Sequence, residues 1–183
     1  MAGRLVLVVG PSGVGKDSIM NGARLRLASD SRVVFPRRMV TRPAEAGGED
    51  HDSTDPATFL SLHDAGAFAL AWSAHGLSYG IPVGINADLF AGRTVVVNVS
   101  RAVIEQARQS YPGLLVITIV APLDEIRRRL QARGREAGSG IEARLARAEA
   151  FTIAGPDVAV VQNDGALADA VEAFVRLVQP PSA

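Results

Sequence analysis

Short apolar runs alternate with amphipathic segments along the chain, and this alternation predicts the elements. Runs typical of strands buried on both faces of a sheet lie at 5–9, 33–35, 94–99, 114–120 and 158–161. Segments with apolar residues at helical spacing lie at 16–28, 101–110, 122–133, 141–150 and 167–178. Buried strands that alternate with helices indicate an α/β fold, in which helices cover both faces of a parallel sheet.

Residues 34–92 depart from this alternation. An arginine-rich stretch and an acidic, glycine-containing loop come first, and a helix over 55–65, a hairpin over 67–79 and a helix within 81–90 follow. We therefore expect one domain, residues 1–183. Its core comprises 1–33 and 93–183, and 34–92 form a small substrate lobe inserted beside the first loop.

That first loop follows the apolar run 5–9 and has the composition of a phosphate-binding loop. Its residues are Gly10, Pro11, Ser12, Gly13, Val14, Gly15, Lys16, Asp17 and Ser18. Glycines let backbone N–H groups converge on phosphate oxygens, and the helix that follows points its N-terminus at the same charge. Lys16 is the only lysine among 19 basic residues, and its compact ammonium suits the outer phosphates of ATP. The alternative is a glycine-rich turn with a chance lysine.

One position differs from the usual phosphate-loop pattern. After Gly-Lys the pattern expects Ser or Thr, whose hydroxyl binds Mg²⁺, whereas this chain has Asp17 followed by Ser18. A carboxylate beside a triphosphate is repelled unless a cation lies between them. We therefore expect Asp17 and Ser18 to face Mg²⁺, directly or through water. The alternative is that Asp17 only complements the helix dipole.

A second concentration of charge lies near the C-terminal third of the chain. Between 127 and 147 there are seven arginines, at 127, 128, 129, 133, 135, 144 and 147, and two acidic residues, Glu136 and Glu142. A solvated helix face usually mixes both signs more evenly. The segment 127–150 is therefore predicted to be an arginine-rich lid that places guanidinium groups on charge developing in phosphoryl transfer. The alternative is that these charged residues only keep the protein soluble and form a few ion pairs.

Composition narrows the function classes. The 183 residues include no cysteine, which excludes a disulfide framework, a zinc-thiolate site and a thiol nucleophile. A formal net charge of zero argues against a general nucleic-acid binder, and no apolar stretch is long enough for a membrane span. We expect a cytoplasmic protein without nucleic-acid or membrane partners.

Four features carry a resemblance to the guanylate kinase family over nearly the whole chain. They are the loop 10–18, Thr41-Arg42, Tyr79-Gly80 and the arginine-rich lid, in this order. Within that family the chain resembles the ribose 1,5-bisphosphate phosphokinase branch, on Lys16-Asp17-Ser18 and on segments 41–51, 97–102, 133–136, 143–145 and 162–165. The resemblance implies a three-layer P-loop NTPase fold with an inserted substrate lobe and a lid.

The resemblance also implies an activity. ATP with Mg²⁺ would phosphorylate ribose 1,5-bisphosphate to 5-phosphoribosyl 1-diphosphate, a step of phosphonate breakdown. Implied catalytic residues are Lys16, Arg133 and Arg144. Implied substrate-binding residues are Arg42, Glu49, His51, Tyr79, Asn98, Ser100 and Arg101, of which Arg42 and Tyr79 would hold an acceptor phosphate and Arg101 is a candidate for the second one.

Departures from guanylate kinases bear on the acceptor. Carboxylates that help to hold GMP in that family fall near Leu70, Asn98 and Ser100 here, and neutral polar groups suit a sugar better than guanine. The rivals are a guanylate or other nucleoside monophosphate kinase and a non-catalytic guanylate kinase-like binding module. His63 is predicted to be structural, while the roles of His51 and His75 stay open.

Replacing Lys16 with alanine tests the phosphate-loop interpretation. We expect a loss of about 100-fold or more in turnover, because an electrostatic contact to the transferring phosphates is removed. The free energy of unfolding should change by only about 1 kcal/mol or less. Steady-state kinetics and urea denaturation measure the two effects, and an unchanged rate would remove Lys16 from the mechanism.

Overall fold

Side chains along the central strand β1 (Arg4–Val9) point alternately to the two faces of a sheet and build two separate cores. Leu5, Leu7 and Val9 belong to one buried cluster, and Val6 and Val8 belong to the other. All five are at most 2% exposed. A strand that is apolar at every position must be covered on both faces, as the sequence pattern predicted.

The computed structural model, which describes residues 3–43, 50–132 and 138–179, shows the parallel sheet directly. In the described residues its strand order is β2-β7-β1-β8-β9, and every neighbouring pair is parallel. The flanking strands are β2 (Val33–Val34), β7 (Thr94–Asn98), β8 (Leu115–Val120) and β9 (Val158–Gln162). The predicted strands are therefore all present, and no end is shifted by more than one residue.

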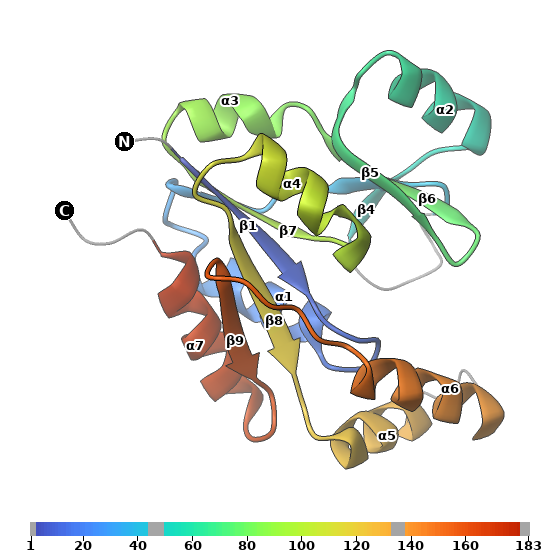
Figure 1. Ribbon diagram of the computed structural model, residues 1–183. Coiled ribbons are helices and arrows are strands. Elements are labelled where there is room, and N and C mark those ends of the chain that lie inside the picture. The colour runs from blue at the N-terminus through green and yellow to red at the C-terminus, as the bar shows by residue number, and fades with distance from the viewer. Residues whose placement is uncertain (1–2, 44–49, 133–137, 180–183) are drawn as a thin grey trace.

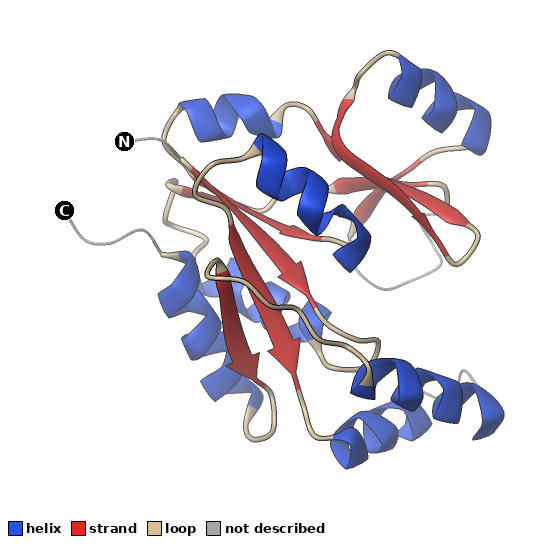
Figure 2. Ribbon diagram, in the orientation of Figure 1, coloured by secondary structure: helices blue, strands red, loops and turns tan. Residues whose placement is uncertain are grey.

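Helices cover both faces of this sheet (Figures 1 and 2). α1 (Lys16–Arg26) and α7 (Leu167–Val178) contribute to the cluster around Val6 and Val8. α3 (Ile85–Phe90), the 3-10 turn η2 (Arg101–Val103) and α4 (Ile104–Ser110) contribute to the cluster on the other face. α5 (Leu123–Ala132) and α6 (Gly138–Glu149) lie beyond the carboxyl ends of β1, β8 and β9 (Figure 1).

A second, smaller sheet forms the inserted lobe. Its order is β4-β3-β6-β5, and α2 packs against β5 and β6. The bounds are β3 (Arg38–Val40), β4 (His51–Ser53), α2 (Pro56–Asp64), β5 (Phe68–Ala74) and β6 (Leu77–Pro82). Leu70 and Ile81, each 1% exposed, join the core cluster that contains Val97. One face of the lobe is thus anchored on the core beside the end of β7.

The helix predicted over 55–65 is present as α2, and Asp55 caps it by accepting from the Ala57 and Thr58 amides at 2.9 and 3.0 Å. The predicted elements differ from the observed ones in three other places. β3 and β4 were not predicted, because three residues are too few to show a period of two. Residues 81–82 complete β6 rather than beginning a helix, and α6 begins at 138 rather than 141. No helix of the described part is long and apolar enough to span a membrane.

Gly22 permits the close packing of α1 on α7. A Cβ at this position would lie 2.6 Å from Cγ2 of Val171. We expect Gly22→Ala to destabilise the protein by about 1 kcal/mol, because overpacking outweighs the gain in helix propensity. In a Val171→Ala background the same change should stabilise. Urea denaturation of the four proteins measures this, and a stabilising Gly22→Ala in the wild type would contradict the packing.

Candidate active site

The loop between β1 and α1 curls around the ammonium of its own lysine. Gly13 and Gly15 have φ of 87° and 96°, a region that L-residues with a Cβ rarely adopt. Lys16 Nζ donates to the carbonyl oxygens of Gly10 and Pro11 at 2.7 and 3.0 Å. The first amides of α1 therefore open onto the space next to Lys16, which is the arrangement of a phosphate-binding loop.

Two side chains from distant parts of the chain hold this loop at the carbonyl of Val14. Asn163 Nδ2 donates to Val14 O at 2.7 Å, and Arg129 Nη1 donates to the same oxygen at 3.1 Å. Arg129 Nη2 also donates to Asn163 O at 3.1 Å. Because the Val14 carbonyl and the Gly15 N–H belong to one planar peptide, fixing the carbonyl fixes the direction of the amide toward a phosphate.

The loop meets the end of β7 at Asp17. Asn98 Nδ2 lies 3.4 Å from Asp17 Oδ1, and Asn98 is 6% exposed. On its other side, the Asn98 carbonyl lies 3.4 Å from Arg38 Nη1, which comes from the second sheet. A row of polar groups therefore runs from the phosphate loop to the inserted lobe.

The face of the second sheet that turns toward the core carries cations and aromatic rings. Cα pairing places Arg38 opposite His51, and Val40 opposite Tyr79, so these side chains share one face. The Arg38 guanidinium lies 5.2 Å from the Tyr79 ring, and Arg42 Nη2 lies 3.4 Å from His51 Nδ1. The rings of Trp72 and Tyr79 stack at 5.3 Å. This face suits an anionic, hydroxyl-rich ligand.

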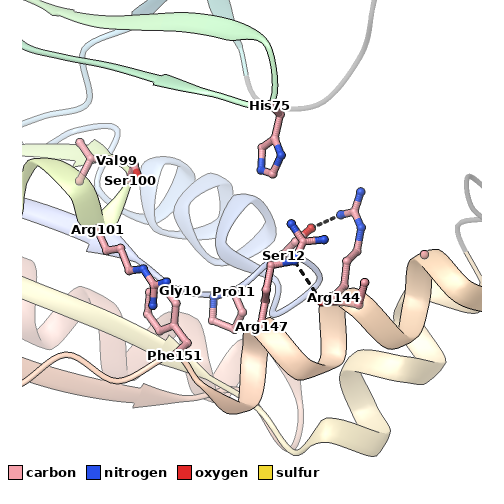
Figure 3. A pocket seen from close by; sticks show the side chains of 12 residues that line it. Gly10, Pro11, Ser12, His75, Val99, Ser100, Arg101, Arg144, Arg147 and Phe151 are labelled. Atoms are coloured by element: carbon pink, nitrogen blue, oxygen red, sulfur yellow. Dashed lines mark hydrogen bonds between the residues drawn. The ribbon is translucent and has the colours of Figure 1, made fainter.

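A cavity of about 520 Å³ lies where the phosphate loop, the end of β7, α6 and the tip of the β5–β6 hairpin converge. Figure 3 shows His75 above the loop, and Arg144 with Arg147 rising from α6 on the opposite side. Arg144 Nη1 donates to Ser12 Oγ. Arg101 lines the same cavity, with its guanidinium 5.4 Å from the Phe151 ring. Arg144 of the lid is thus in direct contact with the phosphate loop.

A second cavity, of about 330 Å³, lies on the other side of the loop. Ser18 lines it together with Gly13, Gly15, Arg129 and Asn163. Asp17, by contrast, contacts Asn98 at the end of β7. The two residues predicted to face Mg²⁺ therefore have different surroundings.

Several arginines of the lid segment form ion pairs. Arg127 pairs with Glu142 across α5 and α6, and Arg128 pairs with Glu125. Arg128 hydrogen bonds lower the pKa of the Glu125 carboxyl. The local excess of positive charge is thus partly a structural device that joins the two helices, as the alternative interpretation of this segment held.

The oxygen donors at this site suit a Mg²⁺ ion that binds together with substrate phosphates better than a metal ion that is held by protein side chains alone. No cluster of three His, Asp or Glu side chains that could hold an ion occurs among the described residues. Mg²⁺ is commonly bound through one or two carboxylates together with substrate phosphates. The Asp17 carboxylate, one residue from Lys16 at the start of α1, has the chemistry for that role.

Proteins named ribose 1,5-bisphosphate phosphokinase PhnN match the chain over nearly its full length. The Pseudomonas fluorescens protein is 51% identical over 178 residues, which cover 94% of this chain and 93% of that protein. The Desulfomicrobium baculatum protein is 45% identical over 175 residues, covering 96% and 94%. The chain belongs to this PhnN family.

The PhnN-family chain also shares its fold with guanylate kinases. The crystal structure of guanylate kinase from Anaplasma phagocytophilum superposes with a TM-score of 0.68 and covers 97% of this chain and 85% of that one. At 19% sequence identity the likeness concerns the fold alone. No protein-family model matches the chain. The predicted resemblance to a guanylate kinase-like P-loop kinase is confirmed by these two comparisons.

The structure brings many of the predicted site residues together. Lys16 contacts Gly10 and Pro11 of the loop, Asp17 contacts Asn98, and Arg42 contacts His51. Tyr79 lies against Arg38, which also reaches Asn98. Ser100 lines the larger cavity and also caps η2, where its Oγ accepts from the Ala102 amide at 3.3 Å. Arg133 and Glu49 lie outside the described residues. His63 is exposed on α2, beside Asp64.

Three residues of the site were not singled out from the sequence: Arg38, Arg129 and Asn163. The sequence signal for Arg38 is its place in the arginine-rich stretch just before Thr41-Arg42. No local pattern indicates that Arg129 and Asn163 meet at Val14, since they lie 115 and 149 residues away along the chain.

Asn163→Asp tests the support of the loop. The change removes the N–H group that donates to the Val14 carbonyl and puts an oxygen acceptor next to that buried carbonyl. We therefore expect the free energy of unfolding to fall by about 1–3 kcal/mol. The KM for MgATP should rise about tenfold, with a smaller change in the acceptor KM. Gln162→Glu, an amide-to-acid change at an exposed neighbour, is the control. Equal kinetic effects of the two variants would contradict a positioning role for Asn163.

Proposed function

We propose that this protein uses ATP to phosphorylate ribose 1,5-bisphosphate, giving 5-phosphoribosyl 1-diphosphate and ADP. The observation that carries the proposal is the meeting of two sites at Asp17 and Asn98. One is a phosphate loop for a nucleotide donor. The other is a cationic face of the inserted lobe for an anionic acceptor. The substrate itself is that of the relatives named ribose 1,5-bisphosphate phosphokinase.

The reaction needs no strong general base. An oxygen of the 1-phosphate attacks the γ-phosphorus of ATP in line, a new P–O bond forms, and the bond from that phosphorus to the β–γ bridging oxygen breaks. ADP leaves with the electron pair of that bond. Because the nucleophile is already an anionic oxygen, no proton has to be removed from it. Positioning and charge neutralisation therefore supply the catalysis.

The chain's own residues divide this work. Lys16 and the loop amides would hold the β- and γ-phosphates, and Arg144, which contacts Ser12 in the loop, would neutralise charge on the transferring group. Arg133 is proposed for the same group from the resemblance. Arg42 and Tyr79 would hold an acceptor phosphate. Bound Mg²⁺ would supply charge compensation between the phosphates and Asp17.

The character of the acceptor face favours a sugar phosphate over GMP. By the family resemblance, the place of a guanine-binding glutamate falls near Leu70, which is 1% exposed in the core cluster. The place of an aspartate falls near Asn98, whose amide is directed to Asp17. Loss of a carboxylate that accepts from guanine at these positions removes a group that selects this base. A non-catalytic binding module is disfavoured because Lys16 and Arg144 both remain in contact with the loop.

An acceptor competition tests the proposal. Purified protein with MgATP is offered ribose 1,5-bisphosphate and, separately, GMP, and ADP release is measured. We expect kcat/KM for the sugar bisphosphate to exceed that for GMP by about 1,000-fold or more, because a mismatched polar site rejects the wrong ligand by several kcal/mol. Turnover of GMP alone would overturn the assignment in favour of guanylate kinase, and failure to bind ATP would favour a binding module.

A further inference from the structure

Ribose 1,5-bisphosphate has two phosphates, so an acceptor site for it needs two anion-binding groups. The proposed function, on which this inference rests, assigns Arg42 and Tyr79 to one phosphate. Arg101 was the sequence-based candidate for the other. The structure places its guanidinium over the Phe151 ring at 5.4 Å, in the cavity beneath the lid (Figure 3). Arg101 therefore lies against Phe151, just after α6, in the cavity next to the phosphate loop.

A different arginine lies on the acceptor face itself. Arg38 begins β3, and its Cα pairs with that of His51 on β4. Arg42 reaches the same histidine, with Nη2 3.4 Å from His51 Nδ1. Both arginines are thus associated with His51, Arg38 through the pairing of the two strands and Arg42, just after β3, through its side chain.

The surroundings of Arg38 place its guanidinium between the two lobes. Its Nη1 lies 3.4 Å from the Asn98 carbonyl at the end of β7, and its Cζ lies 5.2 Å from the Tyr79 ring. Its Nε is buried. An arginine held against an aromatic ring is pre-organised, and its planar fork matches a phosphate in two parallel hydrogen bonds.

The neighbouring Arg37, just before this strand, has a structural role. Its Nη2 lies 3.1 Å from carboxylate oxygens of both Asp50 and Asp52, and donates to the His51 carbonyl at 2.8 Å. The half-exposed Arg37 side chain therefore connects the start of β3 to β4 at the surface. Arg38, one residue further, belongs to the opposite face.

We propose that Arg38 binds one phosphate of the sugar bisphosphate while Arg42 and Tyr79 bind the other. An acceptor that is anionic at both ends needs two such cations, and Arg38 begins β3 while Arg42 comes just after its end. Arg38 is in this way the residue that makes the site specific for a bisphosphate. A sugar or nucleoside with one phosphate leaves one of the two guanidinium groups without its anion.

Equilibrium binding tests this proposal independently of turnover. Trp72 is the only tryptophan of the chain and stacks on Tyr79, so its fluorescence reports on this face. Ribose 1,5-bisphosphate, ribose 1-phosphate and ribose 5-phosphate are titrated into the wild type, Arg38→Gln and the control Arg37→Gln. In the wild type and the control, the bisphosphate should bind about 10- to 100-fold more tightly than either monophosphate.

In Arg38→Gln this advantage of the bisphosphate should disappear, while at least one of the two monophosphates, the one held by Arg42 and Tyr79, keeps its affinity within about threefold. An advantage that persists in Arg38→Gln overturns the proposal, as does equal weakening of all three ligands, which is the result of a merely structural role. A wild type without any preference for the bisphosphate overturns it too. If Arg38→Gln does not fold, Arg38→Lys, which keeps the charge but loses the fork, should reduce the advantage partly.

Failure of the proposed function gives a different result. A protein that binds the bisphosphate with the predicted Arg38 dependence, but transfers no phosphate to it from MgATP, retains the two-phosphate site and loses the kinase assignment. A protein that phosphorylates the bisphosphate equally well as wild type and as Arg38→Gln retains the kinase assignment and loses the role of Arg38.

Discussion

In the phosphate loop, backbone amides can converge on a phosphate because the chain turns from strand to helix without a Cβ in the way. The rest of this molecule is arranged around that turn. Positive φ at Gly13 and Gly15 makes the turn possible. The turn is not rigid by itself, because glycine is the most flexible residue. Asn163 and Arg129, which share the Val14 carbonyl, supply the rigidity from outside the loop.

Parallel strands bring the two substrates together. β7 and β1 are neighbours, so the end of β7 lies beside the phosphate loop that follows β1. The inserted lobe is anchored on the same cluster through Leu70 and Ile81. As a result, Arg38 of the lobe reaches Asn98 at the end of β7, and Asn98 in turn reaches Asp17 of the phosphate loop. Ligands of open α/β sheets bind at this carboxyl edge for the same topological reason.

Arginine has several different tasks in this chain, and its charge alone does not tell them apart. Arg127 and Arg37 join elements through carboxylates, and Arg129 fixes a backbone carbonyl. Arg144 contacts the phosphate loop, and Arg38 is held on the acceptor face by a ring and a carbonyl. The difference lies in what each guanidinium meets, which depends on the packing of elements far apart in sequence.

Sequence alone determined the alternating strands and helices, the inserted lobe's hairpin and α2, the loop around Lys16 and the family resemblance, because these depend on local periods, glycine positions and spacing. It did not indicate β3 and β4, whose three residues carry too little pattern. Only the tertiary structure decided that Asp17 meets Asn98, that Asn163 supports Val14, and that Arg38 lies between the Tyr79 ring and the Asn98 carbonyl. Such contacts join residues separated by tens of positions, and their pairing is set by strand order and register, which no single segment contains.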